Sequence, residues 1–283
     1  MKQLIVTADD FGREAAVNEA VEEAHRNGIL STASLMVAAP AAADAVARAR
    51  RLPGLRVGLH LVLVDGTPAL PAAAVPALVG GNGEFEPNMV RAGIRFAFSP
   101  EARRQLAAEI RAQFEAFRAT GLALDHANGH KHFHLHPTIG RLILEIGRDY
   151  GLRAVRLPAE PVAALQRAFP DERAAVPPYA LAIAVLRRRL RRGGIACNDH
   201  VFGLAWSGGM TEERVMRLLP CLPDGTSEIY FHPATGRTPS LEAAMPGYRN
   251  REELAALTSP AIRQRIAELG IRLVSFTDLA ADR

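Results

Sequence analysis

The sequence is poor in cysteine and in aromatic residues, and it has no long apolar run. Two cysteines, Cys197 and Cys221, occur among 283 residues, and aromatic residues make up 6%. Two cysteines are too few for a disulfide framework, so we expect reduced thiols in a cytoplasmic protein. No stretch approaches the roughly 18 consecutive apolar residues that a transmembrane helix requires. We also find no signal-peptide pattern, because the chain passes from Met1 directly into the apolar run 4–6.

Lysine is almost absent as well. All but two of the 34 basic residues are arginine, the exceptions being Lys2 and Lys131, and the formal net charge is +4. A basic balance can indicate a nucleic-acid or anionic-lipid partner. The arginines are spread along predicted helix faces, and no nucleic-acid-binding motif accompanies them. We therefore expect no nucleic-acid partner.

The remaining composition, with 48% hydrophobic and 23% charged residues, is typical of a globular protein. Strand-like runs occur at 4–7, 34–37, 56–61, 123–126, 154–157, 227–231 and 272–275. Helical patterns occur at 13–27, 41–51, 100–120, 137–150, 178–192, 211–219 and 251–269. This alternation predicts an α/β fold with a parallel sheet. We expect an irregular, TIM-barrel-like (β/α) barrel with seven strands, and an open sheet is the alternative.

We expect a single domain over residues 1–283, with a helical insertion at 160–195. Side chains capable of catalysis follow five of the predicted strands. They are the pair Asp9 and Asp10, then His60, the segment 125–136, Arg156 and His232. Because the carboxyl ends of parallel strands meet at one edge, we expect these groups to form one site.

The adjacent carboxylates Asp9 and Asp10 could lie side by side only if the strand that carries them is irregular. Successive strand residues point to opposite faces, so a regular strand would not place both side by side. One carboxylate could reach a metal while its neighbour turns toward a substrate or a supporting residue. The alternative is that one of them caps the helix predicted at 13–27.

Histidine is concentrated in one short segment. Five of the nine histidines lie between positions 126 and 136: His126, His130, His132, His134 and His136. In an extended chain the last four would line one face. Imidazole binds divalent transition metals strongly, usually together with a carboxylate. An accidental surface run is the alternative for this segment, and an ordinary core residue is the alternative for His60, but their placement near the Asp pair favours a metal site.

A site with one Asp and two His leaves coordination positions for water. A metal there lowers the pKa of its water and polarises a carbonyl under attack. A nearby carboxylate can accept the water proton, and a histidine can protonate a leaving amine. Arg156 would orient the carboxylate or bind a substrate oxygen, with an ordinary salt bridge as the alternative.

Three segments resemble the YdjC-like carbohydrate deacetylases, a family that includes chitooligosaccharide monodeacetylases. They are Thr-Ala-Asp-Asp-Phe-Gly at 7–12, Gly-Leu-His-Leu at 58–61, and the His-x-His-x-His run before Pro137. The resemblance extends from residue 4 to about residue 276. More narrowly, segments 128–137 and 198–204 resemble the hopanoid-biosynthesis-associated branch called HpnK.

The resemblance implies a (β/α) barrel that hydrolyses the acetamido group of an amino sugar. It implies that Asp10, His60 and His130 bind one divalent metal ion. Zinc suits such ligands, and magnesium, cobalt, nickel and manganese stay open. The HpnK branch implies a lipid-linked substrate, the N-acetylglucosaminyl group of a hopanoid, with release of acetate.

The same resemblance implies the catalytic residues. Asp9 would be the general base, His232 the general acid, and Arg156 the residue that orients the base. One position departs from the family, because many members carry Asp where this chain has Asn128. Either a supporting carboxylate is missing there or Asp125 replaces it. The choice of the second histidine ligand among His126, His130 and His134 therefore stays open.

The segment 178–192 joins an apolar half to an arginine-rich half. It is too short to cross a bilayer, but it could lie at the inner face of the cytoplasmic membrane. The alternative is a core helix with a basic, solvated end. Two other functions also stay open for the chain. They are a phosphoesterase, which would usually hold two metals, and a non-catalytic lipid- or metal-binding protein.

Overall fold

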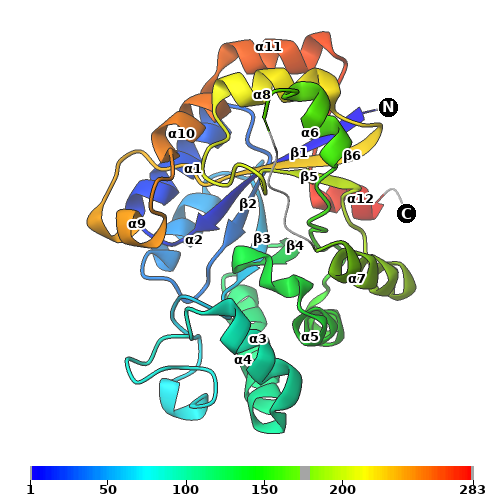
Figure 1. The fold of residues 1–283 in the computed structure, drawn as a ribbon. Helices are drawn as coiled ribbons and strands as arrows, with labels where there is room; N and C mark the ends of the chain where they lie inside the picture. The colour runs from blue at the N-terminus through cyan, green and yellow to red at the C-terminus, as the bar shows by residue number, and fades with distance from the viewer. Residues whose placement is uncertain (1, 173–178, 282–283) are drawn as a thin grey trace.

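A curled sheet of parallel strands lies at the centre of the molecule, with helices around it (Figure 1). The computed structural model describes residues 2–172 and 179–281. Within these residues the strands are β1 (Lys2–Phe11), β2 (Thr32–Leu35), β3 (Arg56–Leu61), β4 (Leu124–Gly129), β5 (His200–Phe202), β6 (Gly225–Phe231) and β7 (Arg272–Val274). Their order is β4-β3-β2-β1-β6-β5, and β7 pairs with β1. The expected barrel-like α/β fold with seven parallel strands is confirmed.

The middle strand β1 is apolar because both of its faces are covered. Leu4, Ile5, Val6 and Ala8 are fully buried. A strand buried on both faces is expected to read as a continuous apolar run, as this one does before its polar end. Because all pairings are parallel, the carboxyl ends of the strands meet at one edge of the sheet.

Helices cover the outside of the sheet (Figure 1). They are α1 (Ala15–Asn27), α2 (Ala42–Arg50), α3 (Met89–Phe98), α4 (Pro100–Ala119), α5 (Pro137–Gly147), α6 (Val162–Ala168), α7 (Ala180–Gly193), α8 (Glu212–Leu218), α9 (Pro239–Ala244), α10 (Asn250–Thr258), α11 (Pro260–Glu268) and α12 (Phe276–Ala281). The short 3-10 segments are η1 (Ala72–Ala74), η2 (His130–Leu135), η3 (Arg148–Tyr150) and η4 (Leu219–Cys221). Side chains cap the N-termini of several helices. For example, the Ser99 hydroxyl accepts a hydrogen bond from the backbone N–H of Ala102 at the start of α4.

Two of the predicted elements were wrong, and the sequence did not predict β5 or α3. The segment 154–157 makes only isolated bridges, from Val155 to Ala127 and from Ala154 to Ala196, and at Leu157 both backbone groups bond the Asn198 side chain. The helix predicted at 251–269 is two helices, since Pro260 cannot continue α10 and instead begins α11.

The predicted insertion at 160–195 contains α6 and α7. Its residues 173–178, including the expected helix start at residue 178, lie outside the described residues. In the described part of the chain, no helix combines the length and the apolarity needed to cross a membrane.

Candidate functional site

A kink at the end of β1 turns two neighbouring carboxylates into one pocket. Asp10 has a φ of 63°, in the left-handed region, and the pairing of β1 with β2 loses register between Ala8 and Phe11. Asp9 and Asp10 therefore both line the pocket at the strand ends. The opposite orientation expected of a regular strand does not apply, because the strand is not regular here. Neither carboxylate caps α1, whose N-cap is Glu14.

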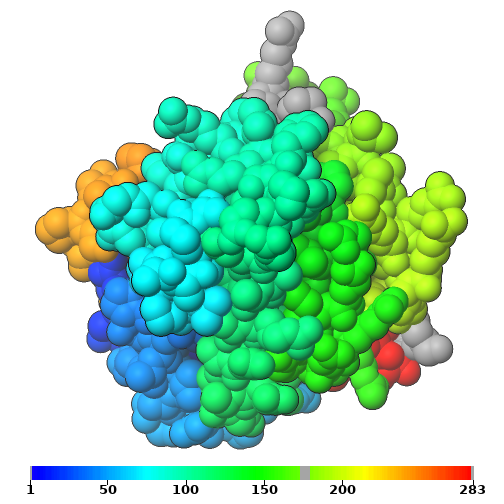
Figure 2. All heavy atoms as spheres, turned by 90° about the horizontal axis from the view of Figure 1, so that it is seen from below, coloured from blue at the N-terminus to red at the C-terminus, as the bar shows by residue number. Residues whose placement is uncertain are grey.

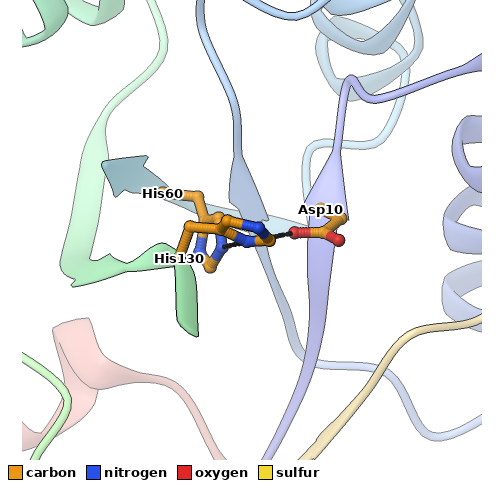
Figure 3. Close-up of side chains that lie close together, drawn as sticks. All are labelled: Asp10, His60 and His130. Carbon is orange, nitrogen blue, oxygen red and sulfur yellow. Dashed lines mark hydrogen bonds and ion pairs between the residues drawn. The ribbon is translucent and has the colours of Figure 1, made fainter. Parts of the chain in front are cut away.

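The side chains of Asp10, His60 and His130 converge from β1, β3 and the start of η2 (Figure 3). Asp10 Oδ1 lies 3.3 Å from His60 Nε2 and 3.4 Å from His130 Nδ1. The two ring nitrogens are 3.4 Å apart. Asp10 Oδ1 is buried and has no hydrogen-bond partner. Three potential ligand atoms thus surround one point.

These separations suit a divalent cation. Ligand atoms about 2.0–2.2 Å from zinc in a tetrahedral site are about 3.3–3.6 Å from one another, which matches the three distances here. Two imidazoles and one carboxylate are also a donor set that zinc accepts, and a fourth position stays free for water or substrate. Asp10, His60 and His130 could therefore hold such an ion.

Asn128 orients the His60 ring. Its Oδ1 is 2.7 Å from His60 Nδ1, so His60 donates from Nδ1 and turns the lone pair of Nε2 toward Asp10. The Asn128 amide group donates to Asp9 Oδ1 at 3.3 Å and to Ser34 Oγ at 2.9 Å. A carboxylate at this position could not donate to Asp9. Asp125 does not replace Asn128, because it bonds His126 and Thr277 instead.

The histidine run is not extended, so the expectation that four rings share one face was wrong. It forms η2, in which Lys131 and His132 have φ values of 52° and 55°. This left-handed pair turns the chain sharply after His130. Only His130 joins the metal-ligand cluster, while the His136 ring accepts the Thr138 N–H at the start of α5.

The other two candidate ligands are already engaged. His134 Nδ1 accepts the Gly129 N–H at 3.0 Å, and His134 Nε2 lies 3.0 Å from the carbonyl oxygen of Arg156. His126 contacts Asp125 and Ser34 through its two ring nitrogens. Neither ring has a free lone pair to offer a metal, which favours His130 among the three histidines.

Arg156 lies fully buried between two carboxylates. It donates to both oxygens of Asp9 and to both oxygens of Glu228, at distances between 2.6 and 3.0 Å. Glu228 also accepts the Thr7 hydroxyl. Arg156 is not among the residues that line the pocket, so the geometry favours orientation of Asp9 over contact with a substrate oxygen.

His232 lies across the pocket at the end of β6, where α10 holds its backbone. Glu253 accepts the His232 N–H at 2.5 Å, and Asn250 donates to its carbonyl at 2.7 Å. The ring lines the pocket, and its Nδ1 is buried without a partner. Sequence reasoning missed Glu228, Asn250 and Glu253, although a glutamate within the apolar run of β6 was a usable signal.

Burial and neighbouring charges set the protonation of the pocket. Burial alone would raise the pKa of Asp9, but Arg156 and then His60 hold it well below its usual range. Burial lowers the pKa of His232, which favours the neutral ring. Asp9, Asp10 and His232 thus face a cavity of about 150 Å³ as two carboxylates and one neutral imidazole.

A family model and the relatives of known name place this chain in the same family. The model of the family described as YdjC-like protein matches residues 3–268. A carbohydrate deacetylase from Geobacillus stearothermophilus is 32% identical, over 97% of this chain and 96% of its own length. A chitooligosaccharide deacetylase from Serratia marcescens is 30% identical, over 98% of this chain and 99% of its own length.

A solved structure shares the fold. The protein from Enterococcus faecalis V583, described as a cellobiose-phosphate cleavage protein, has a TM-score of 0.76 at 24% identity and covers 98% of each chain. At that identity the likeness concerns the fold alone. The match of the family model to nearly the whole chain, together with relatives above 30% identity, is decisive: this chain belongs to the YdjC-like family.

Proposed function

We propose that this chain is a metal-dependent hydrolase that removes the N-acetyl group from an acetamido sugar and releases acetate. One observation carries the proposal. The three ligand atoms of Asp10, His60 and His130 lie together in a pocket that Asp9 and His232 also line. The names of the relatives, carbohydrate deacetylase and chitooligosaccharide deacetylase, support this reaction class.

Each group in the pocket has a role in this proposal. A bound divalent cation supplies Lewis acidity toward water and toward the amide carbonyl. The oxygen of water forms a bond to the acetyl carbon, and the carbon–nitrogen bond breaks. Asp9 takes the proton of the attacking water, and His232 delivers a proton to the departing amine. Arg156 keeps the Asp9 carboxylate in one orientation.

The lowered pKa values of Asp9 and His232 favour a mechanism in which each group passes a proton on and neither keeps it. Because the pKa of Asp9 is far below its usual range, Asp9 favours passing a proton on rather than keeping it. Because burial lowers the pKa of His232, the ring begins neutral and becomes an acid only after it receives a proton from the reaction. One proton of the water therefore reaches the departing nitrogen, and the second is released when the acetic acid ionises, so the products are the amine, acetate and one proton.

The finer substrate rests on the resemblance of segments 128–137 and 198–204 to the HpnK branch. We propose that the amino sugar is the N-acetylglucosaminyl group of a hopanoid. Such a substrate agrees with a cytoplasmic protein that contacts the inner face of the membrane. Zinc is the metal that the ligand set and its spacing favour.

The test is acetate release from N-acetylglucosamine conjugates, with and without a chelator. We expect release that the chelator abolishes and that added zinc restores. Incubation with a glycosylated hopanoid should give a product lighter by one acetyl group. Release that is unaffected by complete metal removal would contradict metal dependence, and a soluble conjugate that reacts while the hopanoid does not would contradict the finer substrate.

The two alternatives give different results in the same experiments. A phosphoesterase of the two-metal kind needs further ligands. In residues 2–172 and 179–281, the cluster of Asp10, His60 and His130 is the one group arranged to hold a metal, which favours a single ion. A non-catalytic binding protein would bind metal or lipid and release no acetate from any conjugate.

A further inference from the structure

Large apolar side chains are exposed mainly at one place on the molecule. Of the seven large apolar residues exposed in the described part of the chain, five lie on α3 or at the start of α7. Their exposed fractions are 70% for Val90, 57% for Ile94, 79% for Phe98, 37% for Tyr179 and 80% for Leu181. Exposed apolar residues gathered in this way mark an interaction surface.

The two helices lie on the same face of the protein. Helix α5 packs against both α3 and α7. Figure 2 shows α5 in green between the teal of α3 and the yellow-green of α7. An apolar groove runs between them, lined by residues such as Met89, Ile94, Phe133, Leu135, Tyr179 and Ala182. We call α3, α7 and this groove the α3–α7 surface.

The apolar residues of α3 form a regular stripe. Val90, Ile94 and Phe98 follow one another at intervals of four, so they lie on one side of the helix. The opposite side is buried through Ala92, Gly93 and Phe96. An apolar stripe that faces away from the core has no partner within the described residues.

The outer face of α7 changes character along its length. Its exposed residues Leu181, Ala184, Arg188 and Arg191 are three or four positions apart and therefore share one face. The first turn of this face is apolar and the rest is basic. Arg188, Arg191 and the neighbouring exposed Arg192 have no ion pair among the described residues.

The charge of the surface selects its partner. Neither α3 nor α7 contains an acidic residue, and Arg91 adds a further exposed positive charge beside Val90. A two-fold contact between copies would bring this patch against itself and oppose arginine to arginine. Apolar side chains flanked by unpaired arginines instead match an anionic bilayer, where apolar groups enter the interface and guanidinium groups meet phosphates.

We propose that the α3–α7 surface docks on the surface of an anionic phospholipid bilayer. The docking is independent of the deacetylase chemistry. The apolar groove shares Lys131, His132 and Tyr179 with the catalytic pocket. A molecule held in the bilayer could therefore reach the pocket without crossing water, a consequence that rests on the proposed function.

The test is co-sedimentation of the full chain with phosphatidylcholine vesicles, prepared with and without phosphatidylglycerol. We expect binding that requires phosphatidylglycerol and weakens with salt. The pair Ile94→Asp and Phe98→Asp should weaken binding at least about tenfold, because it places charge in the apolar interface. The triple change Arg188→Gln, Arg191→Gln and Arg192→Gln should weaken it about a hundredfold.

Matched controls carry the same chemical changes elsewhere. Val162→Asp charges an exposed apolar residue on α6, away from the surface in Figure 1. A triple change to Gln at Arg51, Arg56 and Arg251 removes the same charge from other exposed sites. Both controls should bind vesicles as the unchanged chain does. Equal losses in the controls and in the surface variants would overturn the proposal, as would binding to neutral and anionic vesicles alike.

Two further measurements keep the result interpretable. Every variant should release acetate from a soluble conjugate as the unchanged chain does, so a failure of the deacetylase proposal and a failure of the docking proposal are separately visible. Analytical ultracentrifugation tests whether a second copy of the chain covers the α3–α7 surface instead. A dimer that Ile94→Asp and Phe98→Asp dissociate would show that a second copy covers the surface, and would overturn the bilayer proposal.

Discussion

The guanidinium group of Arg156 donates to both carboxylate oxygens of Asp9, with Nη1 2.6 Å from Oδ2 and Nη2 3.0 Å from Oδ1. Such a bidentate pair fixes the plane of the carboxylate as well as its position. Arg156 also donates to both oxygens of Glu228, which is fully buried. The position of a candidate catalytic group at the pocket surface thus depends on two charged residues, Arg156 and Glu228, that do not line the pocket.

The variant Asp9→Asn tests the proposed base. The amide keeps the shape of Asp9 and can still accept a hydrogen bond from Arg156, but it cannot take a proton. We expect acetate release to fall about 10²- to 10⁴-fold while the metal content is unchanged. Kinetics and elemental analysis of the same preparation measure both. Activity equal to that of the unchanged chain would refute the role of Asp9 as base.

The variant Arg156→Lys tests the buried ion pairs. A lysine ammonium group cannot donate to Asp9 and Glu228 in the forked geometry that the guanidinium provides. We expect the free energy of unfolding to fall by about 3 kcal/mol, measured by urea denaturation. The matched variant Arg251→Lys, at an exposed site, should stay within about 0.5 kcal/mol of the unchanged chain. Similar stability in the two variants would contradict the account.

The variants Asp10→Ala and His60→Ala test the metal ligands. Each removes one of three donor atoms, so we expect metal content and acetate release to be lost together. The unchanged chain should contain about one divalent ion, consistent with one open tetrahedral site. His25→Ala is the control, because His25 bonds the Leu30 carbonyl far from the pocket, and it should keep both properties. Two ions per chain would favour the phosphoesterase alternative.

The variant Asn128→Ala tests the support of His60. Without the Asn128 carbonyl, the Nδ1–H of His60 loses its partner and the ring can turn. We expect metal affinity to fall about 10- to 100-fold. The control is Ser34→Ala, which removes a hydroxyl that contacts Asn128 but not His60, and whose effect should be smaller. A titration with a competing chelator compares them, and equal affinity in Asn128→Ala would count against the role of Asn128.

The His134 ring predicts a loss of stability in acid. Burial, with Arg156 nearby, lowers its pKa to about 3, so the folded chain holds the ring neutral while an unfolded chain protonates it below about 6.5. The unfolded state then binds more protons, and stability is lost as pH falls from about 6.5 toward 3, by up to roughly 1.4 kcal/mol per pH unit.

His134→Gln can keep a donor and an acceptor but does not titrate, which makes it the informative variant. We expect its free energy of unfolding to be less dependent on pH between about 6 and 4 than that of the unchanged chain. The carboxylates with lowered pKa values act mainly below about pH 5, because their unfolded forms protonate near pH 4, and they are the same in both chains. An unchanged slope would show that His134 is not responsible.

Much of the candidate site could be predicted from the positions of the strand ends in the sequence. Asp10, His60 and His130 are far apart in sequence, but each lies near the carboxyl end of a predicted strand, and parallel strands bring such positions together. The alternation of strands and helices predicts that the polar strand ends meet, but it does not choose among His126, His130 and His134. The family resemblance is what implies Asp10, His60 and His130 as the ligands. The family could be predicted from the segments around them, and the match of the family model confirms it.

The remaining features depend on backbone conformation or on distant contacts. The left-handed residues Lys131 and His132 could not be predicted, because neither residue type requires a positive φ. The extended-chain expectation for the histidine run failed for this reason. Helix α3 was missed although its apolar residues recur at helical spacing. The sequence predicts a strand at 154–157, but the backbone of this segment makes only two isolated bridges, and Leu157 bonds the Asn198 side chain, a long-range contact that the local sequence does not reveal.

The left-handed conformation of Asp10 turns the proposed proton acceptor and the proposed metal ligand, which are adjacent residues, into the same pocket. Because Asp9 and Asp10 are adjacent, one backbone conformation sets how far the carboxylate proposed as the base stands from the carboxylate proposed as the metal ligand. Transplanting this centre into another parallel barrel would therefore mean copying the irregular end of β1 together with its two carboxylates. In a regular strand the same pair of residues would point to opposite faces of the sheet, so one carboxylate would face away from the pocket.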